Sequence, residues 1–209
     1  MNYRLKGILR YVFSFTAPLL TNMETIESIT ETGRLLIRPL SLADTPSLTT
    51  ILSDPEVSKH TIQGVCNETS TREFIKKSMS CYESHGYGPW ALIDKGSKAF
   101  IGFCGISPEP VGQLIEINLG YSLARHYWGL GLATESTRAV LTYALGKKKF
   151  KSVIVIIEPD HIASVRVAEK TGFSDFQNEN FHGKNVRIYR MTRDQWSCHK
   201  QKVLQEPGF

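Results

Sequence analysis

The sequence predicts a single domain of mixed α and β structure. Two kinds of segment alternate along the 209 residues: short runs in which apolar side chains recur at every second position, and longer runs in which they recur with a helical period. With 41% apolar residues the chain can bury one sizeable core, and nothing in it calls for a second domain.

Six segments have the pattern of strands. The run from Ser152 to Ile157 is β-branched and apolar from Val153 onward, which suits a buried central strand. Residues 95–98 have the composition of a hairpin turn between two of the others. The six predicted strands are residues 34–39, 90–94, 100–106, 115–123, 152–157 and 186–191.

Four segments have the pattern of helices, at residues 44–53, 70–85, 133–149 and 162–171. Asp44 is expected to cap the first, with Pro46 in its first turn. Ser70 and Glu73 have the spacing of a capping box for the second, which is expected to stop at Gly86. The last dozen residues are polar and are expected to be loose.

Residues 120–135 join a predicted strand to the longest predicted helix. Two glycines, Gly129 and Gly131, let the backbone turn tightly there, and the first turn of the helix offers N–H groups without internal partners. Such a turn binds anions. It is not a P-loop, because Leu132 and Ala133 follow where Lys and Ser or Thr are needed. Too few residues remain for the repeated βαβ units of a dinucleotide-binding domain.

Several motifs, in the right order, resemble the GNAT acetyltransferases, and in particular their branch of RimJ- and RimL-type ribosomal-protein N-acetyltransferases. YWGLGLATE at residues 127–135 is similar to the YWGxGxATE pyrophosphate loop of that branch, with Trp128 where other members have Gln or Arg. Residues 162–173 resemble a second signature, in which Asn-x-Ala-Ser precedes a helix ending in Glu-Lys-x-Gly-Phe. Further similar segments are residues 33–40, 53–57 and 189–196.

The resemblance implies an α+β fold with a central, mostly antiparallel, twisted sheet of about seven strands. In the family this sheet is splayed between its fourth and fifth strands and flanked by about four helices. Because the resemblance covers residues 33–196, residues 1–32 are expected to be an N-terminal extension and residues 197–209 a polar C-terminal tail.

The resemblance also implies an activity, the direct transfer of an acetyl group from acetyl-CoA to a primary amine within a ternary complex. The acceptor would be a protein N-terminus or a small-molecule amine. Backbone groups of Leu119, Tyr121 and Leu123 are expected to hold the pantetheine and thioester. The loop residues expected to bind the cofactor are Trp128, Gly129, Leu130, Gly131, Leu132, Ala133 and Thr134, with His161 and Ser164 on the following helix.

This chemistry needs a base, because an alkyl amine is mostly protonated at neutral pH. Glu116 and Asn118 share one face of the fourth predicted strand, and of the two only Glu116 can accept a proton. We therefore expect Glu116 to act as the base, directly or through a water. The alternative is an exposed strand carboxylate without a catalytic role.

Two positions depart from the family pattern. Ala168 stands where many relatives have a Tyr that reprotonates the thiolate, so Ser164 is expected to take that role; its alternative is to cap its helix. His161 stands where the family has Asn, and an imidazole titrating near 6.5 would make cofactor binding depend on pH between about 6 and 8. Both departures leave open a non-catalytic acyl-CoA-binding module.

The net charge and the positions of the cysteines limit which kinds of partner and metal site are expected. The net charge of +5 is mild and spread along the chain, which suits an acidic cofactor and argues against nucleic acid as a partner. The four cysteines lack a CxxC or metal-ligand spacing, and no two of the six histidines are four residues apart. We expect reduced thiols, no metal and a cytoplasmic location. Relatives of this family often dimerise, so a homodimer is left open.

Residues 1–22 contain no acidic side chain and carry Arg4, Lys6 and Arg10. Their apolar side chains fall on one face of a helix. This pattern favours a mitochondrial presequence or an interfacial anchor, with an incidental extension as the alternative. The segment is too short and too interrupted to span a bilayer, so no stable membrane association is expected.

Overall fold

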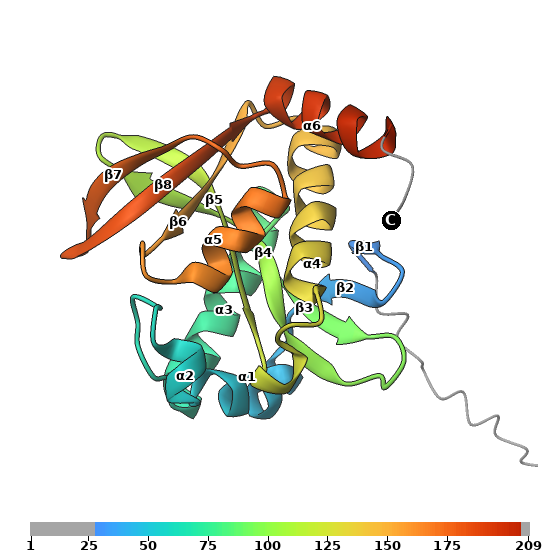
Figure 1. The fold of residues 1–209 in the computed structure, drawn as a ribbon. Helices are drawn as coiled ribbons and strands as arrows, with labels where there is room; N and C mark the ends of the chain where they lie inside the picture. Colours follow the sequence, from blue (N-terminus) through green and yellow to red (C-terminus); the bar gives the residue numbers. More distant parts are fainter. Residues whose placement is uncertain (1–27, 206–209) are drawn as a thin grey trace, which may run out of the picture.

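The computed structural model describes residues 28–205, which form an eight-stranded sheet with helices on both faces (Figure 1). The strand order is β1-β2-β3-β4-β5-β6-β8-β7, and every neighbouring pair is antiparallel except β5 and β6. The mixed, mostly antiparallel fold is thus confirmed. The strands are β1 (Thr30–Glu31), β2 (Leu35–Pro39), β3 (Pro89–Asp94), β4 (Phe100–Val111), β5 (Leu114–Leu123), β6 (Ser152–Ile157), β7 (Phe176–Phe181) and β8 (Lys184–Thr192).

The sheet opens between β5 and β6. These parallel strands are in register only at Asn118 and Ile154, and beyond that point they diverge (Figure 1). Among the described residues, no strand pairs with Leu119 to Leu123 on this side. The splay predicted between the fourth and fifth strands is confirmed, and it leaves backbone donors and acceptors of β5 open to a ligand.

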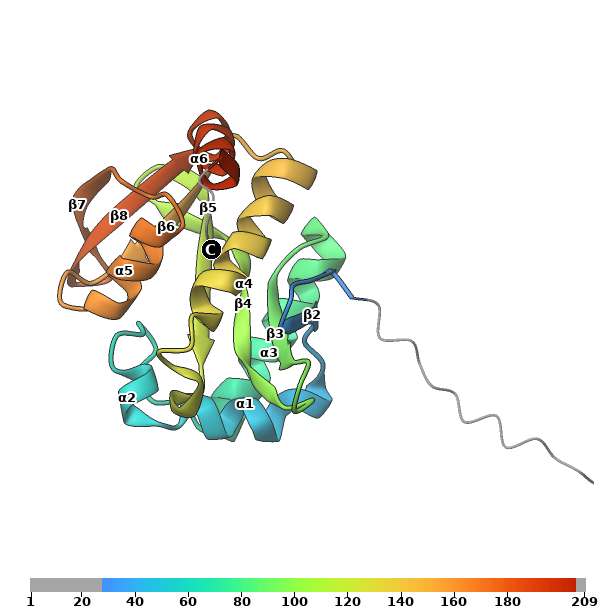
Figure 2. The ribbon, with the colours of Figure 1, turned by 45° about the vertical axis from the view of Figure 1, so that its right-hand side comes forward.

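Helices cover the two faces of the sheet (Figures 1 and 2). Val140 and Leu141 of α4 pack on β4 and β5 in the larger core, whereas Leu48 of α1 and Ile75 of α3 pack on the opposite face. The described part has six α-helices instead of the four predicted. They are α1 (Thr45–Leu52), α2 (Pro55–Ser58), α3 (Glu68–His85), α4 (Leu132–Leu141), α5 (Ile162–Lys170) and α6 (Arg193–Gln205).

The helix starts differ in detail from the prediction. Asp44 is the N-cap of α1, but its carboxylate accepts hydrogen bonds from Arg38 and from the Ser41 N–H instead of capping the helix. The capping box predicted at Ser70 and Glu73 is wrong. Helix α3 starts earlier, with Asn67 as N-cap, and the Asn67 and Ser70 side chains bond each other's backbone N–H.

Gly86 ends α3 as predicted, in the left-handed conformation with φ of 71°. The helix predicted over residues 133–149 is α4 followed by a π-helical turn, Thr142–Lys147. The expectation of a loose tail is wrong for residues 197–205, which belong to α6. The reason is Trp196, whose indole packs against Gly146 and the edge of the main core.

The predicted targeting segment, residues 1–22, lies outside the described residues. Within residues 28–205, no helix combines the length and the apolar character needed to cross a bilayer.

Candidate active site

The loop between β5 and α4 presents an open helix N-terminus. Gly131 is the N-cap of α4 with φ of 77°, and Gly129 has φ of 74°. Both glycines take a left-handed conformation that costs other residues energy. No side chain of the described residues forms a capping hydrogen bond at this end. The first N–H groups of α4 are therefore open to an anion.

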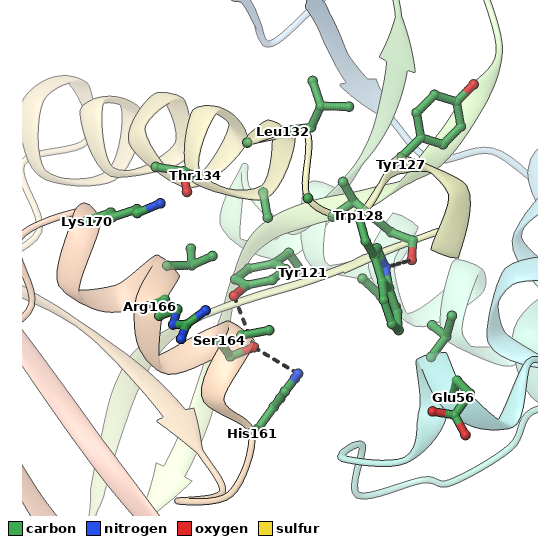
Figure 3. A pocket seen from close by; sticks show the side chains of 18 residues that line it. Glu56, Tyr121, Tyr127, Trp128, Leu132, Thr134, His161, Ser164, Arg166 and Lys170 are labelled. Atoms are coloured by element: carbon green, nitrogen blue, oxygen red, sulfur yellow. Dashed lines mark hydrogen bonds between the residues drawn. The ribbon is translucent and has the colours of Figure 1, made fainter. Parts of the chain in front are cut away.

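A cavity of about 300 Å³, here called the cofactor cavity, lies between this loop, the end of β5 and helix α5 (Figure 3). Leu130 does not line it; this side chain is 54% exposed. The predicted cofactor residues that do line it are Tyr121, Leu123, Trp128, Gly129, Gly131, Leu132, Ala133, Thr134, His161 and Ser164.

Two cations that the sequence analysis missed also line the cofactor cavity. Arg166 and Lys170 lie on the side of α5 that faces the loop, and Lys170 points toward Thr134 (Figure 3). Their spacing of four residues on a predicted helix is a signal that could have paired them. Together with the open end of α4, they make the cavity suited to phosphate groups.

A salt bridge behind the loop fixes its backbone. Arg34 Nη2 lies 2.6 Å from Glu135 Oε2, and Arg34 Nη1 donates a 2.8 Å hydrogen bond to the carbonyl oxygen of Leu130. Thr32 and the Arg34 N–H also donate to Glu135, and these bonds hold the pKa of that carboxyl below its ordinary value against the effect of burial. Because the peptide is planar and trans, the next N–H, that of Gly131, is turned away from Arg34 and remains open to a ligand.

A chain of hydroxyl groups links β5 to α5. Tyr121 Oη donates to Ser164 Oγ over 3.1 Å, and Ser164 Oγ lies 3.3 Å from His161 Nε2 (Figure 3). Burial raises the pKa of Tyr121 to about 12, so its hydroxyl stays protonated. The alternative role for Ser164 as a helix cap is wrong, since the N-cap of α5 is His161.

A smaller cavity of about 140 Å³, here called the inner cavity, lies in the splay between β5 and β6. Leu119 lines it, and Tyr121, His161 and Ser164 line both cavities. His60 and Glu158 border the inner cavity too, and the sequence analysis did not single out either of them.

The comparisons with known proteins agree with this geometry. The model of the acetyltransferase (GNAT) domain family matches residues 34–174. The chain belongs to the GNAT acetyltransferase family. An uncharacterised protein of Bacillus subtilis, YkkB, is 31% identical over 159 residues, covering 76% of this chain and 92% of YkkB.

Solved structures show the same GNAT fold. A GNAT-family acetyltransferase from Bacillus anthracis superposes with a TM-score of 0.66 at 25% identity, covering 78% of this chain and 98% of that one. RimL, a ribosomal α-N-protein acetyltransferase solved in complex with coenzyme A, superposes with a TM-score of 0.65 at 19% identity, covering 81% of this chain and 99% of that one.

Glu116, which the sequence predicts to be the catalytic base of this GNAT protein, lines neither cavity. Its carboxylate accepts a 2.8 Å hydrogen bond from Arg190 Nη1 of β8, and its side chain is 12% exposed. Glu116 is absent from the residues that line the cofactor cavity and from those that line the inner cavity. Its catalytic role stays a prediction.

One group of described residues has the spacing of metal ligands: His60, Glu158 and Asp160. Lys184 already forms an ion pair with Glu158 and neutralises its charge. A metal ion would have to compete with that ammonium group, so we assign no metal to this group of residues.

The lowered pKa of His161 is expected to make the stability of the GNAT domain depend on pH. Burial, and then the neighbouring His60, lower the pKa of His161 from the ordinary 6.5 to about 4, which is below the value of 6.5 on which the expected pH dependence of cofactor binding rests. The unfolded chain takes up a proton below about 6.5 that the folded chain resists until about 4, so stability falls as the pH is lowered through this range.

We expect the melting temperature to fall more between about pH 7 and pH 5 in the natural protein than in His161→Asn, because the Asn side chain does not titrate. Thermal melts of the two proteins across this range measure the difference. Parallel curves would show that His161 takes up its proton as readily in the folded chain as in the unfolded one.

Arg34→Ala is expected to weaken acetyl-CoA binding by about tenfold, since a charged hydrogen bond contributes about 1.5–3 kcal/mol and partial exposure reduces that value. Calorimetry with acetyl-CoA and with acetyl-pantetheine, which lacks the pyrophosphate, separates loop and thioester contacts. Only acetyl-CoA should lose affinity. An equal loss for both ligands would contradict a role of Arg34 in the loop. The control is Arg72→Ala, which removes an exposed ion pair between Arg72 and Glu68 on α3.

Proposed function

We propose that this GNAT protein transfers an acetyl group from acetyl-CoA directly to a primary amine within a ternary complex. The observation that carries the proposal is the open N-terminus of α4, which faces Arg166 and Lys170 across one cavity. Helix N–H groups and two cations suit the phosphates of coenzyme A. The splay beside this cavity suits the extended pantetheine.

In this proposal the amides of residues 129–134 hold the pyrophosphate, and Arg166 and Lys170 neutralise the nucleotide phosphates. The edge of β5 from Leu119 to Leu123, which pairs with no described strand on the side of the splay, binds the pantetheine through its backbone, as β-strand edges bind extended ligands. The carbonyl oxygen of Leu123 also accepts a 2.7 Å hydrogen bond from Trp128 Nε1. The thioester then reaches the hydroxyl groups of Tyr121 and Ser164, which line both cavities.

The Tyr121–Ser164 chain supports catalysis over simple cofactor binding. When the amine nitrogen attacks the thioester carbon, the C–N bond forms, the C–S bond breaks and the sulfur takes the electron pair. A proton must then reach the thiolate. Ser164 can donate it, and Tyr121 Oη, already hydrogen-bonded to Ser164, can replace it.

The alternative is a non-catalytic acyl-CoA-binding module. It is motivated by Ala168, which is 3% exposed and offers no hydroxyl where many family members have a Tyr. Ala168 lines the inner cavity together with Tyr121 and Ser164. Because these two side chains supply hydroxyl groups to the same cavity, the enzyme is the better-supported function.

For the acceptor, we propose a RimJ- or RimL-like reaction on a protein N-terminus, with a small amine as the second choice. Support comes from the YWGLGLATE loop, which resembles the loop of that branch. The superposition on RimL shows a shared fold and does not bear on the acceptor.

Release of free CoA from acetyl-CoA, measured with peptide N-termini, polyamines and aminoglycosides, tests the proposed function. We expect turnover with at least one of these classes and an acetylated product in equal amount. Tight binding of acetyl-CoA without turnover of any amine would contradict the enzyme and favour the binding module.

A further inference from the structure

A histidine pair borders the inner cavity. His60, from the loop between α2 and α3, stacks on His161 at the start of α5, with ring centroids 4.2 Å apart and planes 14° from parallel. The two rings come from segments about a hundred positions apart in the chain. They meet at the end of the splay, where β6 ends.

A carboxylate orients the His60 ring. His60 Nδ1 lies 3.2 Å from Glu158 Oε2, and the His60 side chain is 15% exposed. A carboxylate at this distance accepts the Nδ1 proton, so the neutral ring keeps Nε2 as a proton acceptor. Lys184 in turn forms an ion pair with Glu158. The hydrogen bond and charge of Lys184, together with the hydrogen bond from His60, hold the pKa of that carboxyl below its ordinary value against the effect of burial.

Several charged and titratable groups surround the histidine pair. Asp160 lies 3.8 Å from His60 Nδ1, and Lys59 is the neighbour of His60 in the chain. With Glu158, Lys184 and His161, these are the charged and titratable groups that face His60. The pKa of His161, lowered to about 4, keeps that ring neutral.

We propose that His60, oriented by Glu158, is the base that takes a proton from the acceptor ammonium. The proposal rests on the proposed acetyl transfer. His60 borders the same small cavity as Tyr121 and Ser164, whose hydroxyl groups we place at the thioester. Glu116, the alternative base, is bound to Arg190 outside that cavity.

The acceptor ammonium carries two protons that the transfer must remove. The ammonium gives its first proton to His60 Nε2, and the neutral nitrogen attacks the thioester carbon. As the C–N bond forms and the C–S bond breaks, Ser164 gives a proton to the sulfur. The nitrogen then loses its second proton, which restores the Tyr121–Ser164 chain, and His60 returns its proton to solvent.

His60→Gln should lower kcat/KM for an alkyl amine by about 100-fold near pH 7, the usual contribution of a general base, with the KM for acetyl-CoA unchanged. With a weakly basic acceptor such as an acyl hydrazide, which is neutral at this pH, the loss should largely disappear because no proton has to be removed first. His85→Gln, a change at an exposed histidine near the end of α3, is the matched control and should lose nothing with either amine.

Three outcomes would overturn the proposal. An equal loss with both amines would make His60 a structural residue. A loss confined to the alkyl amine in Glu116→Gln, and absent in His60→Gln, would make Glu116 the base. Failure of the natural protein to acetylate any amine of either class would reject the proposed function, and the role of His60 with it.

Imidazole nitrogen NMR tests the His60–Glu158 pair without turnover. In the natural protein the neutral His60 ring should carry its proton on Nδ1, and in Glu158→Gln the two tautomers should mix. A neutral ring protonated on Nε2 in the natural protein would overturn the proposal even if acetyl transfer is found.

Discussion

Gly131→Val is expected to abolish acetyl-CoA binding in calorimetry while the domain still melts cooperatively. Gly131 has φ of 77°, and the left-handed region costs a residue with a side chain roughly 1–2 kcal/mol, more for a β-branched one. The loop would therefore abandon this conformation, and the N–H groups at the start of α4 would no longer point at one anion. An added Cβ would lie 3.6 Å from Arg34 Nη2, an ordinary contact, so the effect comes from the backbone and not from a clash.

Gly183→Val is the matched control for this experiment. Gly183, in the turn between β7 and β8, has φ of 80° and open space around its Cβ position, so the backbone strain is the same but lies outside the cofactor cavity. It should keep its acetyl-CoA affinity. Unchanged affinity in Gly131→Val would remove the loop as the phosphate site.

Ser164→Ala is expected to lower kcat by about 100-fold, the size of a lost proton donor, with little change in the KM for acetyl-CoA. Ser164 accepts from Tyr121 and lies beside His161 Nε2, so it connects the proton source to the place we assign to the leaving sulfur. Steady-state kinetics of free CoA release separate the two constants.

Tyr121→Phe should reproduce much of this loss, because it removes the group that replaces the proton of Ser164. Ser164→Thr keeps a hydroxyl and should retain most of the rate. A loss of acetyl-CoA affinity in Ser164→Ala as large as its loss of rate would mean that this residue only holds the cofactor.

Much of the fold follows from short-range patterns. The buried strand at residues 152–157 was predicted with its observed bounds because the β-branched run from Val153 to Ile157 suits a strand that is covered on both faces. The roles of Gly86 at the end of a helix and of Gly131 in an anion-binding turn were predicted because both positions favour a residue that can take the left-handed conformation. By contrast β7, with the sequence FQNENF, is an exposed edge strand without alternation and leaves no such signal.

The parts of the site that depend on long-range contacts could not be predicted. Arg34 and Glu135 are 101 positions apart, and His60 and Glu158 are 98 apart; neither pair has a periodic pattern that connects its members. Period two placed Glu116 on a face of β5, but could not show that Arg190 of β8 would bind its carboxylate.

The structure of the protein with acetyl-CoA bound tests the account most directly. We predict pyrophosphate oxygens within hydrogen-bond distance of the backbone N–H groups of residues 129–134, and the thioester sulfur beside Ser164 Oγ. Acetyl-CoA bound away from the start of α4, or with its sulfur far from Ser164 and His60, would contradict it.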